Sequence, residues 1–176
     1  MKSKTFITNS YLETQKVGEN LIGIIPVQGL SLTQKALVIA LHGDLGSGKT
    51  TFVQGLARGL GIKRRIISPT FIIMRTYKIK FKIQNSKFKI VVQNSKFFYH
   101  IDLYRTENES DIEGLGIKEI INDSQNIVAI EWPEKMGNLL PKDRVDIYFE
   151  NLGDNKRKIT IDKSLRHCEE RSDPTQ

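Results

Sequence analysis

A run of nine residues in the first third of the chain has the residue types and the spacing needed to bind phosphate. The run is Gly43, Asp44, Leu45, Gly46, Ser47, Gly48, Lys49, Thr50 and Thr51. It fits the pattern of glycine, four residues, then Gly-Lys-Ser/Thr. Glycines allow backbone conformations in which successive N–H groups converge on phosphate oxygens. A lysine in this position reaches the β- and γ-phosphates, and the Thr50 hydroxyl suits Mg²⁺. We therefore expect these nine residues to bind a nucleotide, with Lys49 also serving catalysis.

The segments on both sides of this run are those that a phosphate-binding loop (P-loop) requires. Before it lies an unalternated apolar segment, 36–41, which is typical of a strand buried on both faces. After it, apolar residues recur at helical spacing as far as Leu60, and Gly61 stands where a helix would end. The helix would point the positive end of its dipole at the bound anion. A glycine-rich turn that matched the pattern by accident would lack this strand–turn–helix context.

Two acidic residues in predicted strands are candidates for catalysis and metal binding. Glu131 directly follows the apolar segment 126–130, and ligands of open α/β sheets lie outside the carboxyl ends of the strands. A carboxylate there can bind Mg²⁺, directly or through water, or polarise the attacking water. Asp102 lies in an otherwise apolar and aromatic strand, 97–104, where an unpaired carboxylate is expensive to bury. The alternatives are an ordinary acid at a strand end for Glu131 and an ion pair with Arg105 for Asp102.

A third catalytic candidate is a threonine. Thr70 follows a Ser-Pro pair and could either sense the nucleotide or cap a strand, and the sequence does not choose between these roles. We interpret His42 and His100 as packed or hydrogen-bonded core histidines rather than metal ligands. Cys168 has no helper residue nearby, so we expect it to be inert.

Length and composition predict one cytoplasmic domain. The 176 residues are enough for a single core, which we place at 1–163, and too few for two comfortable ones. One cysteine excludes an internal disulfide and a cysteine-based metal cluster. The apolar runs are too short to cross a bilayer, and the N-terminus lacks the apolar core of a signal peptide, so we expect no membrane association. The segment 164–176 is polar and without periodicity, which predicts a disordered tail.

The net charge of +7 is concentrated in one segment. Six of the surplus positive charges come from Lys78, Lys80, Lys82, Lys87, Lys89 and Lys96, with no acid among them. Within this segment Gln-Asn-Ser-Lys-Phe occurs at 84–88 and again at 93–97. Two copies are too few for a solenoid. We interpret residues near 78–96 as an inserted lysine-rich hairpin, whose edge the lysines protect from aggregation; contact with RNA is the alternative.

The rest of the chain contains further predicted elements. Ser10 begins a helix that ends at Pro26, and Glu13 completes a capping box with Ser10. The others are a strand at 71–77, a glycine-interrupted helical stretch at 110–122, and an antiparallel strand pair at 145–150 and 156–161.

The motifs in their order along the chain resemble one family of proteins. They are the segment 10–14, the loop 43–51, Ser-Pro-Thr-Phe at 68–71, Tyr-His-Ile-Asp-Leu-Tyr-Arg at 99–105, Glu113 with Leu115-Gly116, and Ile-Glu-Trp-Pro at 130–133. This set resembles the TsaE family, formerly YjeE, the bacterial ATPases needed to make threonylcarbamoyladenosine next to the tRNA anticodon. The resemblance implies the α/β class and a P-loop NTPase-like three-layer fold, with a central mixed, mostly parallel sheet flanked by helices.

The resemblance also implies an activity, cofactors and partners. Family members bind ATP and Mg²⁺, hydrolyse ATP slowly and act in complex with the TsaB and TsaD proteins. TsaD carries the transfer chemistry, so the ATPase would meet tRNA only indirectly, through the complex. Residues near 78–96 and those after Lys163 depart from the family pattern.

By position, the resemblance assigns roles to individual residues. Lys49 and Thr50 would hold phosphates and Mg²⁺, Glu131 and Asp102 fall on the metal-site acids, and Thr70 falls on a switch-like threonine. The other matched positions are Ser10 and Thr14 near the nucleotide base, Arg157 as a C-terminal nucleotide contact, and Trp132 beside the active site.

Three alternatives to this ATPase share the P-loop. A small-molecule kinase could use Arg64-Arg65, but the chain shows no clear lid segment. A GTPase is disfavoured because no Asn-Lys-x-Asp guanine motif is present, and the Asp-x-x-Gly at 111–114 follows no apolar strand. A non-catalytic, nucleotide-dependent binding module would overlap with the family function, since that function is exerted through partners.

Overall fold

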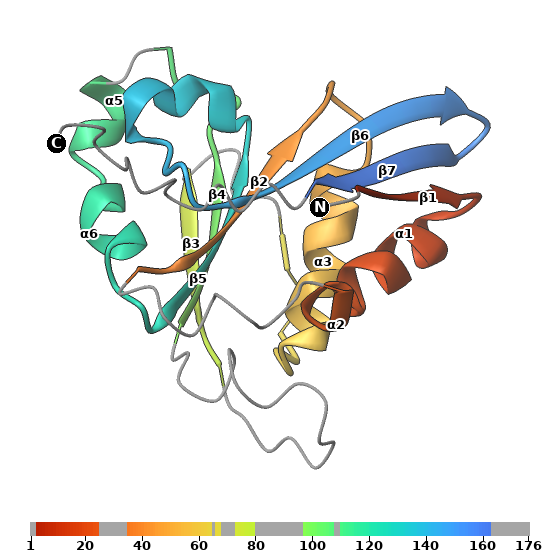
Figure 1. Ribbon diagram of the computed structural model, residues 1–176, viewed down its shortest axis with the longest axis horizontal. Coiled ribbons are helices and arrows are strands. Elements are labelled where there is room, and N and C mark those ends of the chain that lie inside the picture. Colours follow the sequence, from red (N-terminus) through yellow and green to blue (C-terminus); the bar gives the residue numbers. More distant parts are fainter. Residues whose placement is uncertain are drawn as a thin grey trace, which may run out of the picture.

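The computed structural model describes residues 3–24, 35–64, 66–67, 73–79, 97–107 and 110–162, and arranges them around one seven-stranded sheet (Figure 1). In chain order the elements are β1 (Lys4–Thr8), α1 (Tyr11–Glu19), α2 (Leu21–Ile24), β2 (Leu37–His42), α3 (Lys49–Gly59), β3 (Met74–Lys78), β4 (Phe97–Asp102), α5 (Ser110–Glu113), α6 (Ile117–Ile121), β5 (Asn126–Glu131), the 3-10 helix η2 (Pro133–Leu139), β6 (Val145–Gly153) and β7 (Lys156–Asp162). The strand order is β1-β7-β6-β2-β5-β4-β3.

The four central strands run parallel, and the outer ones are antiparallel to their neighbours. β2 pairs in parallel with both β5 and β6, and β5 pairs in parallel with β4. β7 is antiparallel to β6 and β1, and β3 is antiparallel to β4. The carboxyl ends of β2, β5 and β4 therefore meet at one edge of the sheet. This mixed α/β sheet, with parallel strands at its centre, confirms the predicted fold class.

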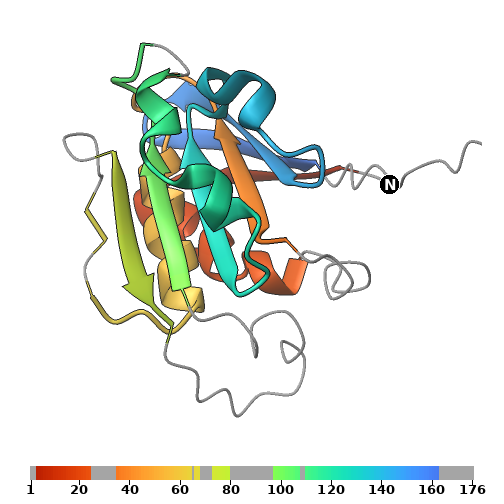
Figure 2. The same cartoon turned by 90° about the vertical axis from the view of Figure 1, so that its left-hand side faces the viewer.

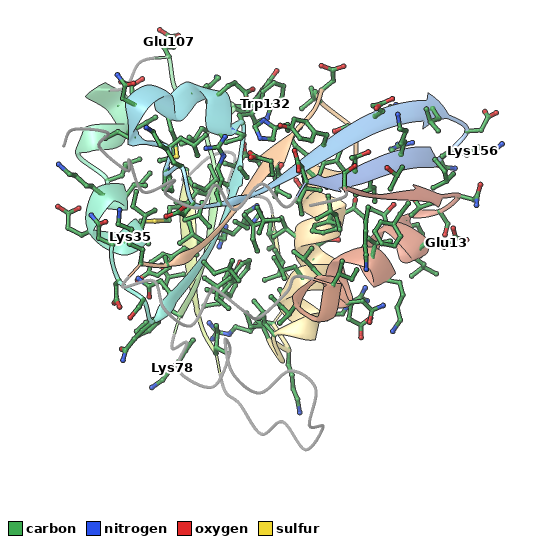
Figure 3. All side chains as sticks on the ribbon, viewed as in Figure 1. Glu13, Lys35, Lys78, Glu107, Trp132 and Lys156 are labelled. Atoms are coloured by element: carbon green, nitrogen blue, oxygen red, sulfur yellow. The ribbon has the colours of Figure 1, made fainter. Side chains whose placement is uncertain are left out.

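Helices cover both faces of the sheet. α1, α2 and α3 pack on one face and α5, α6 and η2 on the other (Figures 1 and 2). β2 is apolar without alternation because it serves both cores: Ile39 packs with Phe52 of α3, and Val38 packs with Ile117 of α6 and Met136 of η2. Figure 3 shows side chains between the layers, with Trp132 at one end of the sheet and Lys78 at the opposite end.

The N-terminal region differs from its prediction in two ways. β1 was not predicted, because this edge strand is mostly exposed and is held by its pairing with the distant β7. The helix predicted from Ser10 to Pro26 is two helices, with α1 capped at Asn20 before α2. Ser10 caps α1 as predicted, since its Oγ accepts a hydrogen bond from Glu13 N at 3.2 Å. The Glu13 carboxylate accepts from Asn9 N at 2.8 Å rather than from the Ser10 amide.

Other boundaries shift by a few residues. The predicted strand 97–104 ends at Asp102, because a turn closes when Thr106 N donates to Leu103 O at 3.1 Å. β3 replaces the strand predicted at 71–77, and its first expected residues lie outside the described part of the chain. The antiparallel pair β6–β7 and the division of 110–122 into α5 and α6 are confirmed. Residues 80–96 and 164–176, where we predicted the hairpin and the tail, also lie outside the described residues.

Glycines bring the backbones of α1 and α3 into direct contact. A Cβ built on Gly55 of α3 would lie 1.9 Å from the carbonyl oxygen of Gln15 in α1. A Cβ on Gly18 of α1 would lie 2.2 Å from the Phe52 oxygen. No side chain fits at either position without moving one helix. Because α3 begins with Lys49, this contact fixes where the phosphate-binding loop enters its helix.

We expect Gly55→Ala to lower the free energy of unfolding by about 1–3 kcal/mol, since the added methyl group would overpack the α1–α3 contact. This holds although alanine favours a helix over glycine by up to about 1 kcal/mol. Gly114→Ala is the control, because a Cβ there meets nothing within 4 Å; its effect should stay within about 0.5 kcal/mol. Urea unfolding measures both, and wild-type stability in Gly55→Ala would contradict the packing argument.

Candidate functional site

The loop between β2 and α3 has the backbone conformation expected of a phosphate-binding loop. Gly43, Gly46 and Gly48 have φ angles of 138°, 75° and 106°, values that L side chains rarely adopt. Gly48 is the N-cap of α3 and provides no side-chain cap. The first N–H groups of a helix lack partners within the helix, so those at the start of α3 stay available to a ligand. Space is also restricted, because a Cβ on Gly43 would lie 2.5 Å from the Phe149 oxygen.

Lys49 is a buried cation in this loop. Its Nζ donates hydrogen bonds to Gly43 O at 2.6 Å and Asp44 O at 2.9 Å, and lies 4.3 Å from the centre of the Trp132 ring. Burial lowers the pKa of Lys49 below its ordinary value of 10.5, although the negative charge of Glu131 acts in the opposite direction. Among the described residues Lys49 makes no ion pair. Its neighbours therefore hold the ammonium group without neutralising it.

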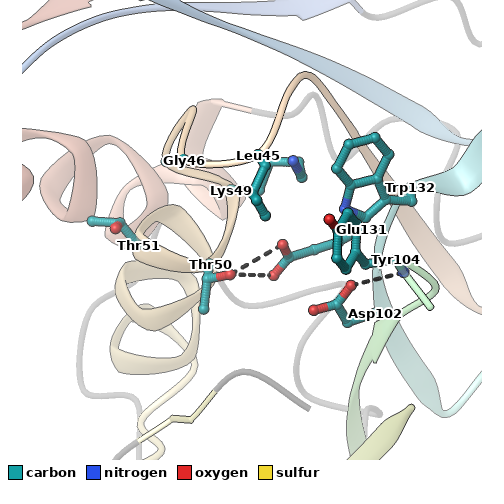
Figure 4. A pocket seen from close by; sticks show the side chains of 10 residues that line it. Leu45, Gly46, Lys49, Thr50, Thr51, Asp102, Tyr104, Glu131 and Trp132 are labelled. Carbon is teal, nitrogen blue, oxygen red and sulfur yellow. Dashed lines mark hydrogen bonds between the residues drawn. The ribbon is translucent and has the colours of Figure 1, made fainter. Parts of the chain in front are cut away.

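Glu131 lies beside the first turn of α3. The Thr50 hydroxyl donates to both of its carboxylate oxygens, at 2.8 Å and 3.0 Å (Figure 4). The Nε2 atom of His100 lies 2.8 Å from Glu131 Oε1. All three side chains come from different elements, α3, β5 and β4, and they meet because the sheet and α3 are in contact. The structure thus brings the predicted acid to the predicted loop.

Asp102 is the cross-strand neighbour of Glu131. The two residues are paired in the β4–β5 register, and both are almost fully buried. One Asp102 oxygen accepts a hydrogen bond from Tyr104 N at 3.1 Å. The two acids face the same cavity, of about 230 Å³, which is lined by Leu45, Gly46, Gly48, Lys49, Thr50, Thr51, Asp102, Tyr104, Glu131 and Trp132.

Of the residues that the resemblance assigns to nucleotide contacts, Arg157 and Thr14 lie at the phosphate-binding loop, and Ser10 lies at the start of α1. Arg157 of β7 donates to Gly46 O at 3.2 Å, and a Cβ on Gly48 would lie 3.7 Å from both Arg157 and the Thr14 methyl group. The Thr14 hydroxyl is turned away, 2.8 Å from the Thr8 hydroxyl. The hydroxyl of Ser10 is engaged in capping α1. Thr70 lies outside the described residues, so its role stays a prediction.

Two aromatic side chains form the wall of the cavity opposite α3. The rings of Tyr104 and Trp132 lie 5.3 Å apart, and Lys135 ties the Tyr104 turn to η2 by donating to the Tyr104 and Thr106 carbonyls. Trp132 has a left-handed backbone, with φ 60° and ψ 49°. Such conformations are costly outside glycine and occur often at functional sites. The position of Tyr104 two residues after Asp102 was the signal that could have identified it as a lining residue.

The fold and the strand–loop–helix site define a P-loop NTPase-like protein. The family model described as "Threonylcarbamoyl adenosine biosynthesis protein TsaE" matches residues 8–159, and the chain belongs to the TsaE family. The family predicted from the ordered motifs is therefore confirmed.

Individual relatives agree with this assignment. The chain is 39% identical over 124 residues to "tRNA threonylcarbamoyladenosine biosynthesis protein TsaE" of Bacillus subtilis, covering 70% of this chain and 68% of the relative. It is 40% identical over 121 residues to the protein of the same name from Borreliella burgdorferi, covering 68% and 77%. The crystal structure of Bacillus subtilis YdiB matches with a TM-score of 0.61 and 28% identity, over 91% of this chain and 84% of that one. In the described part of the chain, no helix is both long enough and apolar enough to span a membrane.

A second polar cluster fixes the end of β2 just before the loop. His42 Nε2 and Arg144 Nε lie 2.8 Å and 2.7 Å from the same oxygen of Asp146, and the His42 ring stacks on Tyr148 at 4.7 Å. Burial raises the pKa of Asp146, but hydrogen bonds from His42 and Arg144 and the charge of Arg144 outweigh it, so the pKa lies below its ordinary value of 3.8. His42 is thus hydrogen-bonded, as predicted.

We expect Asp146→Asn to lower the free energy of unfolding at neutral pH by about 1–3 kcal/mol, because a buried charge-assisted network loses its anion. A carboxyl whose pKa is depressed by folding contributes stability above its unfolded pKa and loses it as the pH falls through the lower folded value. The gap between wild type and variant should therefore narrow below about pH 4, as measured by urea unfolding at a series of pH values.

Glu150→Gln is the control for this prediction. Glu150 is paired with Lys158 at 2.9 Å, but both side chains are exposed, and exposed pairs contribute at most about 1 kcal/mol. A constant gap between wild type and Asp146→Asn down to the lowest pH would contradict the assigned role of the Asp146 charge.

Proposed function

We propose that the protein binds ATP with Mg²⁺ and hydrolyses it slowly, as the ATPase required for threonylcarbamoyladenosine modification of tRNA next to the anticodon. The observation that carries the proposal is the contact between the Thr50 hydroxyl and both oxygens of Glu131 beside the phosphate-binding loop. Nucleotide hydrolysis needs a phosphate cradle, metal-binding oxygens and a group that orients water. Family membership supports the tRNA part of the proposal.

The loop fits a polyphosphate. Free N–H groups at the start of α3 and the positive end of its dipole favour an anion. Lys49 is buried and, among the described residues, contacts two carbonyl oxygens and an aromatic ring. A phosphate would give this cation an anionic partner in direct contact, which the described residues do not provide.

The oxygen atoms beside the loop fit Mg²⁺. This ion prefers oxygen ligands and usually keeps several waters, and Thr50, Glu131 and Asp102 supply a hydroxyl and two carboxylates. The described residues contain no group of three or more His, Cys, Asp or Glu that could hold a metal by themselves, so phosphate and water would complete the ion's coordination. When bound, Mg²⁺ would neutralise charge on the phosphate oxygens.

The remaining predicted residues surround this centre. Glu131, held by Thr50, would orient a water molecule toward the terminal phosphate, either directly or as a ligand of the metal ion. Thr14 and Arg157 lie at the loop on the side of β7 and α1, and with Ser10 they would contact the nucleoside. Thr70 is proposed as the residue that senses the terminal phosphate.

The proposal gives the protein partners but not the transfer reaction. Several relatives bear the name of tRNA threonylcarbamoyladenosine biosynthesis proteins. Following the family resemblance, we propose that this chain acts with TsaB and TsaD, that TsaD transfers the threonylcarbamoyl group, and that tRNA is met through the complex.

Two variants separate binding from turnover. Lys49→Ala should weaken ATP binding by about 100-fold or more, since the principal cation for the phosphates is lost. Glu131→Ala should retain binding and lose hydrolysis by about 100-fold. The fluorescence of Trp132, the single tryptophan, reports binding from beside Lys49. Lys63→Ala, an exposed lysine away from the loop, is the control. Unchanged ATP affinity in Lys49→Ala would refute the P-loop assignment.

ATP hydrolysis by the pure protein, alone and with TsaB, TsaD and tRNA, tests the function. We expect slow release of phosphate alone and a higher rate with the partners. A rate of ATP hydrolysis that is the same with and without the partners would count against the tRNA-modification role. Phosphate transferred to a metabolite would instead identify a small-molecule kinase.

A further inference from the structure

His100 contacts the predicted catalytic carboxylate from a fully buried position. The residue has no exposed surface, and its Nε2 lies 2.8 Å from Glu131 Oε1. His100 is paired with Ala129 in the β4–β5 register, two residues before the pair Asp102–Glu131. The side chains of His100, Asp102 and Glu131 therefore project from the same face of the sheet.

The surroundings of the other ring nitrogen favour one tautomer of His100. Nδ1 is buried, and no hydrogen-bond partner for it is found in the described part of the chain. A proton on Nδ1 would be an unsatisfied buried donor, which is costly. Glu131 already accepts hydrogen bonds from Thr50 on both oxygens, as an ionised carboxylate does. Donation to Glu131 Oε1 requires a proton on Nε2, and an Nδ1 without a proton avoids an unsatisfied buried donor, so the geometry favours the Nε2–H tautomer.

This hydrogen bond restricts the rotation of the carboxylate. Without it, Thr50 would be the one described side chain that holds Glu131 by a hydrogen bond. The Thr50 hydroxyl is itself a proposed Mg²⁺ ligand and would have to turn its lone pair to the ion. His100 can keep its bond to Oε1 while Thr50 changes partners. A donor of this kind fixes a ligand without touching the reacting atoms.

We infer that His100 is a positioning residue: through its Nε2–H group it holds the Glu131 carboxylate in the orientation required for hydrolysis. The inference rests on the proposed function for its effect on turnover. Its geometric part, the tautomer and the bond to Glu131, is independent of that function.

NMR of the nucleotide-free protein tests the geometric part. Long-range ¹H–¹⁵N correlation should show the proton of His100 on Nε2. The resonance of this proton should move upfield in Glu131→Gln, because a neutral amide oxygen is a weaker acceptor than a carboxylate. The inference would be overturned by a proton on Nδ1, or by an Nε2–H chemical shift that is the same in the wild type and in Glu131→Gln.

Kinetics test the role in turnover. His100→Leu should lower kcat by about 10–100-fold, as loss of a residue that orients a ligand usually does, with unchanged ATP affinity. His100→Gln should recover most of the loss, because its side-chain N–H can occupy the place of Nε2–H. Ile101→Val, on the opposite face of β4, is the packing control and should keep wild-type kcat.

The outcomes distinguish the inference from the proposed function. Full turnover in His100→Leu, or equal losses in the Leu and Gln variants, would overturn the positioning role. If the wild type hydrolyses no ATP, the proposed function fails instead, and the NMR spectrum still decides whether His100 donates to Glu131.

Discussion

The parallel pairing of β2, β5 and β4 is the constraint on which the site depends. These strands end at one edge of the sheet, so the loop after β2, Glu131 at the end of β5 and Asp102 at the end of β4 meet there. None of the three is near another in sequence. A shift of one residue in the β4–β5 register would turn Asp102 and His100 to the opposite face. The apolar layers on both sides of the sheet thus hold the register on which the chemistry depends.

The site brings one buried cation and two buried carboxylates together. Lys49 is buried against carbonyls and a ring, while Glu131 and Asp102 are buried a short distance away, across the cavity that all three line. Burial disfavours the charged form of the lysine, and the acids favour it. A ligand that carries both phosphate and a divalent cation would complement both signs at once. Phosphate alone would meet two buried carboxylates, and a metal alone would meet a buried ammonium group.

The sequence predicted most of the elements that carry the site. β2, α3 and β5 followed from unbroken apolar runs and from helical spacing, because their burial on both faces leaves a strong local pattern. β1 was missed because a short, exposed edge strand is stabilised only by its distant partner β7. Glu131 and Asp102 lie beside the loop, a position that the local pattern indicated because it locates strand ends. The bond from His100 to Glu131 could not be predicted, because it depends on the register between two strands, β4 and β5, that are separated in the chain by residues 103–125.

The backbone contact between α1 and α3 has a mechanical consequence. Two helices that touch without intervening side chains cannot slide or tilt independently, because there is no soft layer between them to deform. α3 and α1 therefore behave as one stiff unit, and β1, which leads directly into α1, is coupled to it. The opposite wall has no backbone-to-backbone contact of this kind in the described residues: its parts, Trp132 and the turn at Tyr104, are joined through side chains, the two aromatic rings and Lys135. The wall of the site formed by α3 is therefore stiffer than the wall formed by Trp132 and Tyr104.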